Sequence, residues 1–398
     1  MAAAGASGPS TGWWVRFSAD APALAGGREL PERFSRWASG RPWLLDVALA
    51  VAMVLVALPQ LRYWARQPDG GFWIRFALTA ALLLPLLLRR RWPVAAFLAA
   101  CGVALVQWAL GVTLLALGDY RAGWPLYERR REIFGISSPK LPFPEWTGQS
   151  LAGKRIVVLP EQGLGDAIQF SRFLLRLPKC GASVLLLSKP SLSFLFANSF
   201  PGIEVQPLSG QIDLGGTDYW VSIMSLAHRL DVQLENLLAE PYLRAPSPEP
   251  HREGCFRVGL MTQGNTKNDN DVHRSLGPDH VRRLQALQDV EVVSLHPEDS
   301  GDFEQTANII AGLDLVISVD TSIGHLAGAL GKPTFLLTPG IGADWRWMAE
   351  RDDSPWYPHH RLFRGAANGD WSPALDRLTL AVAQLRASTL TKSPPPPT

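Results

Sequence analysis

The chain has 398 residues, 47% of them hydrophobic, and its 38 basic and 36 acidic side chains leave a net charge of +2. At about 150 residues per domain, this length suits two domains and additional segments. The near-neutral charge argues against a protein that coats nucleic acid or binds through an acidic tail. Cys101, Cys180 and Cys255 lie too far apart for a zinc motif and are too few for a disulfide scaffold.

Hydrophobic residues concentrate in the first third of the chain, although the mean hydropathy of the whole chain is only +0.04. Residues 1–42 lack a sustained apolar pattern and are expected to form a disordered lead without a secretory signal. Apolar stretches follow at 43–61, 76–88 and 92–118. Because about 20 apolar residues span a bilayer core, residues 43–118 are predicted to form two or three transmembrane helices. The alternative is a set of buried helices in a soluble core, which usually keep a polar face.

The flanks of these stretches also suit a membrane. Trp43, Trp73 and Trp92 lie at their ends, where indole rings favour the interface. Arginines are shared evenly between the two sides, so charge does not select an orientation. The segments LLLPLLLRRRWPVAAFLAA and VALVQWALGV resemble the membrane segment at the start of sensor histidine kinases. That resemblance implies a sensor module, but no phosphoacceptor histidine motif or glycine-rich ATP lid follows.

After Gly118 the composition changes. Residues 119–150 combine an amphipathic, repeat-like helix with a proline-rich connector. Short apolar runs then alternate with helical patterns, which is typical of βαβ units on a parallel sheet. Two consecutive series of this kind predict an α/β fold with two Rossmann-like lobes, over 151–250 and 251–390, that face each other across a cleft. The proline-rich tail, 391–398, is expected to be disordered.

The individual elements can be predicted by range. Strands are expected at 155–159, 183–187, 203–206, 219–222, 256–262, 290–295, 315–319 and 334–338. Helices are expected at 166–177, 191–198, 278–288, 306–311 and 320–330. The last helix has the best end signals, because Asp320 or Thr321 caps its start and Gly331 lies at its expected stop.

The loop PEQGLGD follows the first predicted strand and carries the first candidate site. Gly163 and Gly165 allow the backbone to approach a ligand closely, and Asp166 lies at the start of a helix. Ligands of open α/β sheets bind at the carboxyl ends of strands, so Asp166 is a candidate general base for an acceptor hydroxyl. The alternative is an ordinary helix N-cap, for which aspartate is a preferred residue.

A second candidate site lies in SVDTSIGHLA, residues 318–327. The helix N-terminus offers free backbone N–H groups beside Thr321 and Ser322, which suits a diphosphate. His325 lies one turn into the helix, within reach of a phosphate oxygen. The alternative is a capped core helix with His325 on a polar edge.

Two further segments have polar or aromatic side chains in loop-like sequence. Asp344 and Trp345 belong to DWRW, which suits either stacking on a sugar or base, or ordinary packing of a C-terminal segment. The other segment runs from Gln263 through Asn265 to Ser275 directly after a predicted strand. It is interpreted either as a loop that faces the cleft or as a surface loop.

These motifs together resemble a known family. Residues from about 113 to 385 are similar to the glycosyltransferase-like domain that follows tetratricopeptide repeats in many bacterial proteins and is related to the heptosyltransferases. The resemblance rests on LLALGDYRAGWPLYERR, PEWTGQSLAGKRIVVLPEQGLGDAIQFSRF, GLMTQGN, NDVHRS, LDLVISVDTSIGHLAGALGKPTFLLTP, DWRWM and DSPWYP, in the family's order. The first of these motifs resembles the last helix pair of the repeats.

The resemblance implies a GT-B fold of two Rossmann-like lobes, with a nucleotide-sugar donor held mainly by the second. It implies inverting transfer without a metal or other cofactor, with Asp166 as catalytic base. It also implies that the cluster from Asp320 to His325 holds the donor's diphosphate and ribose. With the candidates above, the predicted donor-binding residues are Gly163, Gly165, Gln263, Asn265, Asp320, Thr321, Ser322, His325, Asp344 and Trp345.

The chain departs from this family in a few places. The family has Gln-Lys-Gly after the strand that matches 290–295, whereas this chain has His-Pro-Glu at 296–298, so a lysine that neutralises diphosphate is missing. The stretch from that strand to Thr306 is also shorter than in the family. Lys267, in the loop after GLMTQGN, is a candidate to restore part of the lost charge.

The leading hypothesis is a membrane-tethered glycosyltransferase that moves a sugar from a nucleotide diphosphate to a hydroxyl of a protein, lipid or glycan acceptor. The predicted partners are the nucleotide sugar, this acceptor and a membrane, with no nucleic acid. Because nucleotide sugars are cytoplasmic, the catalytic domain is predicted to be cytoplasmic. The alternative is a non-catalytic, membrane-bound scaffold or binding protein with a degenerate transferase fold.

Overall fold

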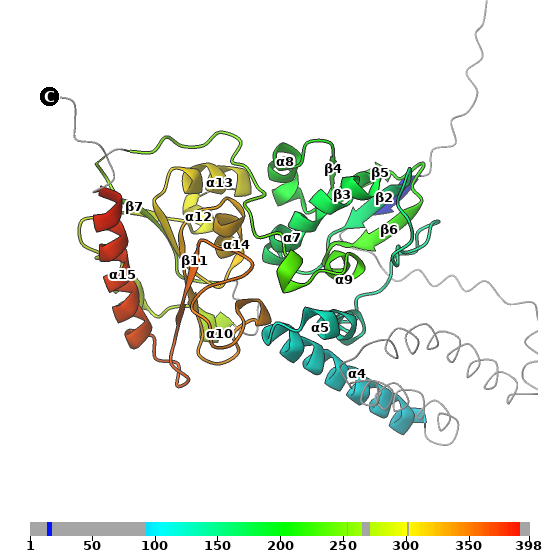
Figure 1. Ribbon diagram of the computed structural model, residues 1–398, viewed down its shortest axis with the longest axis horizontal. Helices are drawn as coiled ribbons and strands as arrows, with labels where there is room; N and C mark the ends of the chain where they lie inside the picture. Colours follow the sequence, from blue (N-terminus) through cyan, green and yellow to red (C-terminus); the bar gives the residue numbers. More distant parts are fainter. Residues whose placement is uncertain (1–13, 18–92, 253, 265–270, 301, 391–398) are drawn as a thin grey trace, which may run out of the picture. The chain divides into compact units, whose positions relative to one another are not determined.

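The computed structural model describes residues 14–17, 93–252, 254–264, 271–300 and 302–390 (Figure 1). The chain divides into two compact units, of which the larger comprises 1–18, 114–121 and 140–398 and the smaller 19–113 and 122–139. The predicted membrane stretches 43–61 and 76–88 lie outside the described residues, as does the predicted tail 391–398.

The first lobe of the larger unit is built on a four-stranded parallel sheet in the order β4-β3-β2-β6. Its strands are β2 (Arg155–Leu159), β3 (Ser183–Ser188), β4 (Glu204–Pro207) and β6 (Tyr219–Ser222). The central strands RIVVL and SVLLLS are apolar runs without alternation, which is typical of strands covered on both faces. Helices α7 (Leu164–Ser171) and α8 (Pro190–Ser199) follow β2 and β3. Val157, Leu185 and Trp220 pack against Leu141 and Phe143 of the connector.

A two-stranded antiparallel sheet joins β1 (Trp14–Phe17) to β5 (Gly210–Asp213). In this register Val15 lies opposite Ile212, whose side chain belongs to the hydrophobic core of the first lobe. This strand lies within the predicted lead 1–42, whose other residues lie outside the described residues. The strand forms by backbone pairing with a segment far along the chain, although its own sequence carries no local pattern.

The second lobe is built on a five-stranded sheet in the order β11-β10-β9-β7-β8, in which every pair is parallel. Its strands are β7 (Arg257–Met261), β8 (Glu291–Ser294), β9 (Leu315–Val319), β10 (Thr334–Thr338) and β11 (His360–Arg364). Helices α11 (Pro278–Gln285) and α15 (Ser372–Leu390) contribute Leu284, Leu375 and Leu378 to the core of this lobe. Helices α13 (Phe303–Ala311) and α14 (Ser322–Ala329) lie on the other side of the sheet from α15 (Figure 1).

Short helices fill most of the remaining connections. They are α9 (Leu226–Arg229), α10 (Asp271–Arg274), α12 (Pro297–Ser300) and the 3₁₀ helices Arg172–Arg176, Pro178–Cys180, Ile223–Ser225, Leu234–Asn236 and Trp345–Trp347. The predicted helix 166–177 is thus present as α7 followed by a tighter 3₁₀ turn. The predicted α/β fold with two parallel sheets is confirmed.

Most residues of helices α4 (Pro93–Ala116) and α5 (Tyr120–Tyr127), together with α6 (Arg130–Ile133), belong to the smaller unit. Gly111 of α4 lies against the backbone of α5, since an added Cβ would be 2.8 Å from the Tyr127 nitrogen. The two helices therefore form a close pair. Among the residues that the structure describes, no helix has both the length and the hydropathy needed to cross a membrane, so the predicted span at 92–118 is unsupported.

The lobes of the larger unit are joined around the buried side chain of Arg172, which follows α7. Its Nη1 donates to the carbonyl oxygens of Leu238, at 2.8 Å, and Trp356, at 2.7 Å. Its guanidinium also lies over the rings of Tyr242 and Tyr357, at 4.7 and 4.6 Å from their centroids. Leu238 belongs to the first lobe, whereas Trp356 and Tyr357 precede β11 of the second, so Arg172 satisfies one carbonyl group of each lobe.

Replacing Arg172 by methionine keeps most of the side-chain volume but leaves the Leu238 and Trp356 carbonyl groups without their donor. Because an unsatisfied buried polar group costs about 1–3 kcal/mol, Arg172→Met should lower the free energy of unfolding by about 3 kcal/mol or more. Urea denaturation measures this change. The matched control is Arg282→Met on α11, whose ion pair with Asp279 is exposed and should matter by less than about 1 kcal/mol. Equal effects of both variants would show that Arg172 does not join the lobes.

Candidate functional site

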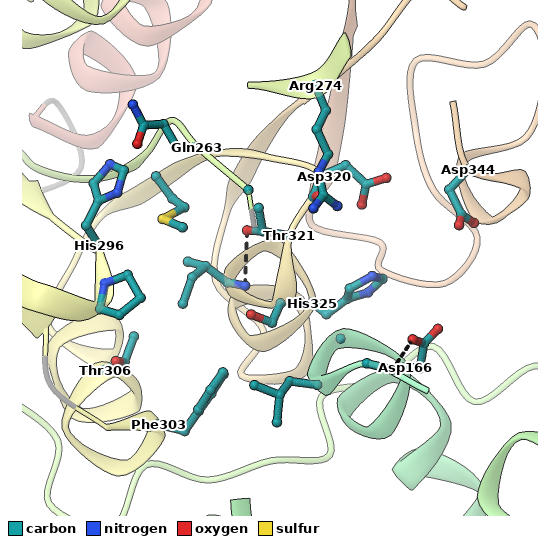
Figure 2. A pocket seen from close by; sticks show the side chains of 18 of the residues that line it. Asp166, Gln263, Arg274, His296, Phe303, Thr306, Asp320, Thr321, His325 and Asp344 are labelled. Atoms are coloured by element: carbon teal, nitrogen blue, oxygen red, sulfur yellow. Dashed lines mark hydrogen bonds between the residues drawn. The ribbon is translucent and has the colours of Figure 1, made fainter. Parts of the chain in front are cut away.

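A pocket of about 780 Å³ opens at the carboxyl ends of the strands and is lined by both lobes (Figure 2). Of the predicted site residues, it is lined by Gly163, Gly165, Asp166, Gln263, Asp320, Thr321, Ser322, His325 and Asp344. They come together because the loops after β2, β7 and β9 leave their sheets at the same edge, as expected for ligand sites of open parallel sheets. The structure thus brings into one cavity segments that are far apart in the sequence.

Two of the predicted site residues, Asn265 and Trp345, are not among the described residues that line the pocket. Asn265 lies outside the described residues, together with the rest of 265–270. Trp345 is buried and does not line the pocket. Its ring lies 5.9 Å from that of Trp356 and 6.4 Å from that of Tyr120, so its position fits packing at the lobe junction.

Asp166 lies in the first turn of α7, on the first-lobe wall of the pocket. Its Oδ2 accepts the backbone N–H of Gly163 at 2.8 Å, which is a capping contact. Its Oδ1 accepts from Nη2 of Arg346 at 2.5 Å. Gly163 is the N-cap of this helix and Asp166 lies three residues later, so the interpretation of Asp166 as the N-cap itself is wrong, although its carboxylate makes a capping contact. The same carboxylate lines the pocket, and its role as a general base stays a prediction.

Arg346 connects the two lobes beside Asp166. It is buried, and its Nη1 pairs with both oxygens of Asp344, at 2.9 and 2.8 Å. Its Nε donates to the side chain of Gln169 in α7, and its guanidinium lies 4.7 Å from the centre of the Trp345 ring. One cation thus holds a carboxylate of each lobe, which fixes Asp166 and Asp344 on facing walls.

Gly165 has a packing role in addition to its place in the pocket wall. A Cβ at this position would lie 2.8 Å from Cδ2 of His325 and 3.5 Å from Cα of Ser322. Only glycine therefore lets α7 and α14 come this close. The sequence motif GLGD accordingly reflects contact between the lobes as well as access for a ligand.

The N-terminus of α14 forms the second-lobe wall of the pocket. Thr321 caps it in an extended conformation and its Oγ1 accepts the N–H of Ile323 at 3.3 Å, the dashed line beside Thr321 in Figure 2. Arg274 lies beside this end, and its Nη1 donates to the carbonyl oxygen of Asp320 at 2.9 Å. A helix N-terminus next to a guanidinium is an electropositive site suited to a phosphate group.

Burial sets the protonation of the titratable groups around this wall. Removal from water and the neighbouring carboxylate of Asp344 raise the pKa of Asp320 to about 6. Removal from water and the nearby cation of Arg346 lower the pKa of His325 well below its usual value. His325 is therefore a neutral imidazole at physiological pH, and it contributes a hydrogen-bonding group without a charge.

Sequence reasoning missed two cations of the pocket, Arg274 and Arg346. Arg274 belongs to the motif NDVHRS, and Gly264 leaves room for it, since an added Cβ would lie 2.5 Å from its Nε. Arg346 is the arginine of DWRW. Arginines inside both motifs were the available signal, but the sequence does not show which arginine turns inward. His296 also lines the pocket, where its ring contacts Oγ1 of Thr262 at 3.1 Å.

Comparison with known families and proteins matches the second lobe to a transferase family. Residues 273–337 match the model of glycosyltransferase family 9 (heptosyltransferase), and residues 34–120 match a domain of unknown function, DUF7134. The chain is 27% identical over 340 residues to Protein FlbA of Caulobacter vibrioides, a match that covers 72% of this chain and 56% of FlbA. The chain thus spans little more than half of that relative.

Solved glycosyltransferases give weaker structural matches. A family 9 glycosyltransferase from Veillonella parvula aligns at a TM-score of 0.40 and 12% identity, over 62% of this chain and 100% of that one. The Escherichia coli ADP-heptose lipopolysaccharide heptosyltransferase II aligns at a TM-score of 0.39 and 12% identity, over 60% and 99% of the two chains.

The raised pKa of Asp320 predicts a pH-dependent stability. Folding favours its protonated form, so the stability that this group contributes is present below about pH 4 and is lost as the pH rises through about 6. Asp320→Asn stays neutral and should therefore gain about 1–3 kcal/mol of unfolding free energy relative to wild type between about pH 4 and pH 7.5. Urea denaturation across this range measures the difference. The 85%-exposed Asp279 offers the control, since Asp279→Asn should show no comparable gain, and a pH-independent difference for Asp320→Asn would contradict the assignment.

Proposed function

We propose that this protein is a glycosyltransferase that moves a sugar from a nucleoside diphosphate to an acceptor hydroxyl. The observation that carries the proposal is the pairing of two facing walls in one pocket. An electropositive wall, made of the α14 N-terminus and Arg274, faces the carboxylate of Asp166 (Figure 2). The match of residues 273–337 to glycosyltransferase family 9 supports the same function.

The electropositive wall is proposed to bind the donor's diphosphate. Backbone N–H groups at the start of α14 and the hydroxyl groups of Thr321 and Ser322 supply hydrogen bonds. The family's lysine after β8 is absent from this chain, and Arg274 supplies a positive charge in its place. Its carbonyl contact with Asp320 holds the guanidinium at the helix end without neutralising it. Its second partner is the carboxylate of Asp271, at 3.1 Å from Nε, so part of its charge is already balanced.

The proposed reaction is a single displacement at the anomeric carbon of the donor sugar. The acceptor oxygen forms a bond to that carbon while the bond from the carbon to the phosphate oxygen breaks. Asp166 takes the proton of the acceptor hydroxyl, and the electron pair of the broken bond goes to the diphosphate. Negative charge thus develops beside Arg274 and the α14 N-terminus, where fixed donors stabilise it.

The hydrogen bonds of Asp166 are compatible with this role. Each carboxylate oxygen has two lone pairs, and each accepts one hydrogen bond, from Gly163 or from Arg346. A lone pair is left on each oxygen for an acceptor proton. The two existing contacts restrict the rotation of the side chain, which supplies the fixed orientation that general base catalysis requires.

We also propose that the enzyme is tethered to a membrane with its catalytic lobes in the cytoplasm, where nucleotide sugars are made. The composition of the apolar stretches 43–61 and 76–88 supports the tether. Fractionation of cells that express the full chain tests it. Recovery of the protein in the supernatant after alkaline carbonate extraction would contradict the tether and leave the transferase proposal in place.

Asp166→Asn should bind the donor normally but transfer sugar at least about 100-fold more slowly, because the amide cannot take the acceptor proton. Nucleotide release from UDP-, GDP- and ADP-sugars, with an extract that supplies protein, lipid and glycan acceptors, measures the rate. Asp344→Asn is the matched control, since it also removes a carboxylate from Arg346 and should cause a smaller loss. Equal turnover by wild type and Asp166→Asn would exclude Asp166 as the base. Failure of every donor to bind in calorimetry would favour the non-catalytic scaffold.

Arg274→Gln should weaken binding of the nucleoside diphosphate by about tenfold to a hundredfold, since a hydrogen bond to a charged group is worth about 1.5–3 kcal/mol. Calorimetry with ADP, UDP, GDP and inorganic pyrophosphate measures the affinities. Arg282→Gln on the exposed face of α11 removes the same charge outside the pocket and should leave them unchanged. If both variants bind equally well, Arg274 is not the cation that replaces the missing lysine.

A further inference from the structure

His325 and Tyr357 form a buried pair behind the electropositive wall. Nδ1 of His325 lies 3.0 Å from the hydroxyl oxygen of Tyr357, and both side chains are buried. The His325 ring is also stacked on Trp347, with 5.3 Å between centroids and 23° between planes. The imidazole is therefore held in one plane and one position, with its Nδ1 edge turned to Tyr357. Nε2 is the ring nitrogen left for the pocket that His325 lines.

The direction of the hydrogen bond between these residues follows from the neighbouring Tyr242. The hydroxyl group of Tyr242 lies 3.0 Å from the carbonyl oxygen of Ile168. Because a carbonyl oxygen can only accept, Tyr242 donates its single hydroxyl proton to Ile168. The Tyr242 oxygen already accepts from Nη2 of Arg172 at 3.3 Å. It lies 3.4 Å from the Tyr357 oxygen, a longer separation than the one to His325.

The proton of Tyr357 therefore has one good acceptor. The guanidinium of Arg172 lies 4.6 Å from the centre of the Tyr357 ring, but its N–H groups cannot accept a proton. The unprotonated nitrogen of a neutral imidazole is a strong acceptor, and Nδ1 is the closest one. If Tyr357 donates to Nδ1, the imidazole proton must lie on Nε2.

We infer that Tyr357 is a positioning residue that fixes His325 in the tautomer with its proton on Nε2, so that a neutral N–H donor faces the diphosphate. The opposite tautomer would turn a lone pair toward the phosphate oxygens and repel them. The inference rests on the proposed function for the identity of the ligand. The tautomer itself is a property of the free protein.

The same contacts connect the donor site to the junction between the lobes. Arg172 of the first lobe contacts Tyr242 and Tyr357, and Tyr357 contacts His325 at the pocket. Gly165 of α7 packs directly on the His325 ring. The proton on Nε2 is thus set by a chain of side chains that exists only while both lobes are packed together.

The test is the tautomer of His325 in the full chain, measured from ¹⁵N shifts and two-bond ¹⁵N–¹H couplings of ¹⁵N-histidine-labelled protein. The His325→Gln spectrum assigns its signals among the eight histidines. We expect wild type to show a protonated Nε2 and an unprotonated Nδ1. Tyr357→Phe, which removes only the hydroxyl group, should populate the Nδ1-protonated form. Tyr242→Phe is the matched control, because it removes a hydroxyl group from the same cluster without touching His325, and it should keep the wild-type tautomer.

Binding of inorganic pyrophosphate supplies the second readout. It should shift the Nε2 signal in wild type and bind about threefold to tenfold more weakly to Tyr357→Phe. A protonated Nδ1 in wild type, or an unchanged tautomer in Tyr357→Phe, would overturn the inference. The wild-type spectrum tests the tautomer of His325 even if Tyr357→Phe fails to fold. Absence of any pyrophosphate or nucleotide binding by wild type would instead contradict the proposed function and leave the tautomer assignment standing.

Discussion

The structure of the larger unit depends on the burial of two guanidinium groups between its lobes. A buried cation is tolerated only when its N–H groups find partners, and neither lobe alone supplies enough of them. Arg172 takes carbonyl groups from Leu238 and Trp356, and Arg346 takes carboxylates from Asp166 and Asp344. Separation of the lobes would remove the contact of Arg172 with Trp356 and that of Arg346 with Asp166. The pocket walls are therefore held at a fixed separation by the requirements of the junction.

This constraint also explains why residues of the site have structural roles. Asp166 caps α7, balances Arg346 and lines the pocket, while Gly165 admits the His325 ring between two helices. A variant at either position changes the packing of the lobes as well as the chemistry. A structural role and a chemical role at this site can therefore be distinguished only with a pair of variants. Both variants must disturb the junction equally, and only one of them may change the group proposed to react.

The sequence predicted those parts of the fold whose signals are local. The strand LVISV and the helix after it were predicted correctly because an apolar run, a capping threonine and Gly331 lie next to one another. The rule that ligands bind at carboxyl ends of parallel strands then placed Asp166 and His325 in one pocket. Long-range contacts were not predictable in this way. The pairing of 14–17 with β5 and the inward turn of Arg274 depend on segments that are distant in the sequence, and aromatic content alone did not reveal that Trp345 packs at the junction.

The balance of charge in the pocket bears on the proposed binding of a diphosphate. Arg346 is already neutralised by two carboxylates, and Glu298 and Asp320 add further acidic groups to the walls. Little net positive charge is therefore available apart from Arg274 and the helix end. The raised pKa of Asp320 eases this problem, because its carboxyl group gives up its charge at a small cost as a second anion approaches. Entry of the proposed diphosphate would raise that pKa further, so proton uptake by Asp320 and anion binding would favour each other. In the proposed reaction, a neutral His325 would donate a hydrogen bond to the leaving diphosphate without a full positive charge that retains the released nucleotide.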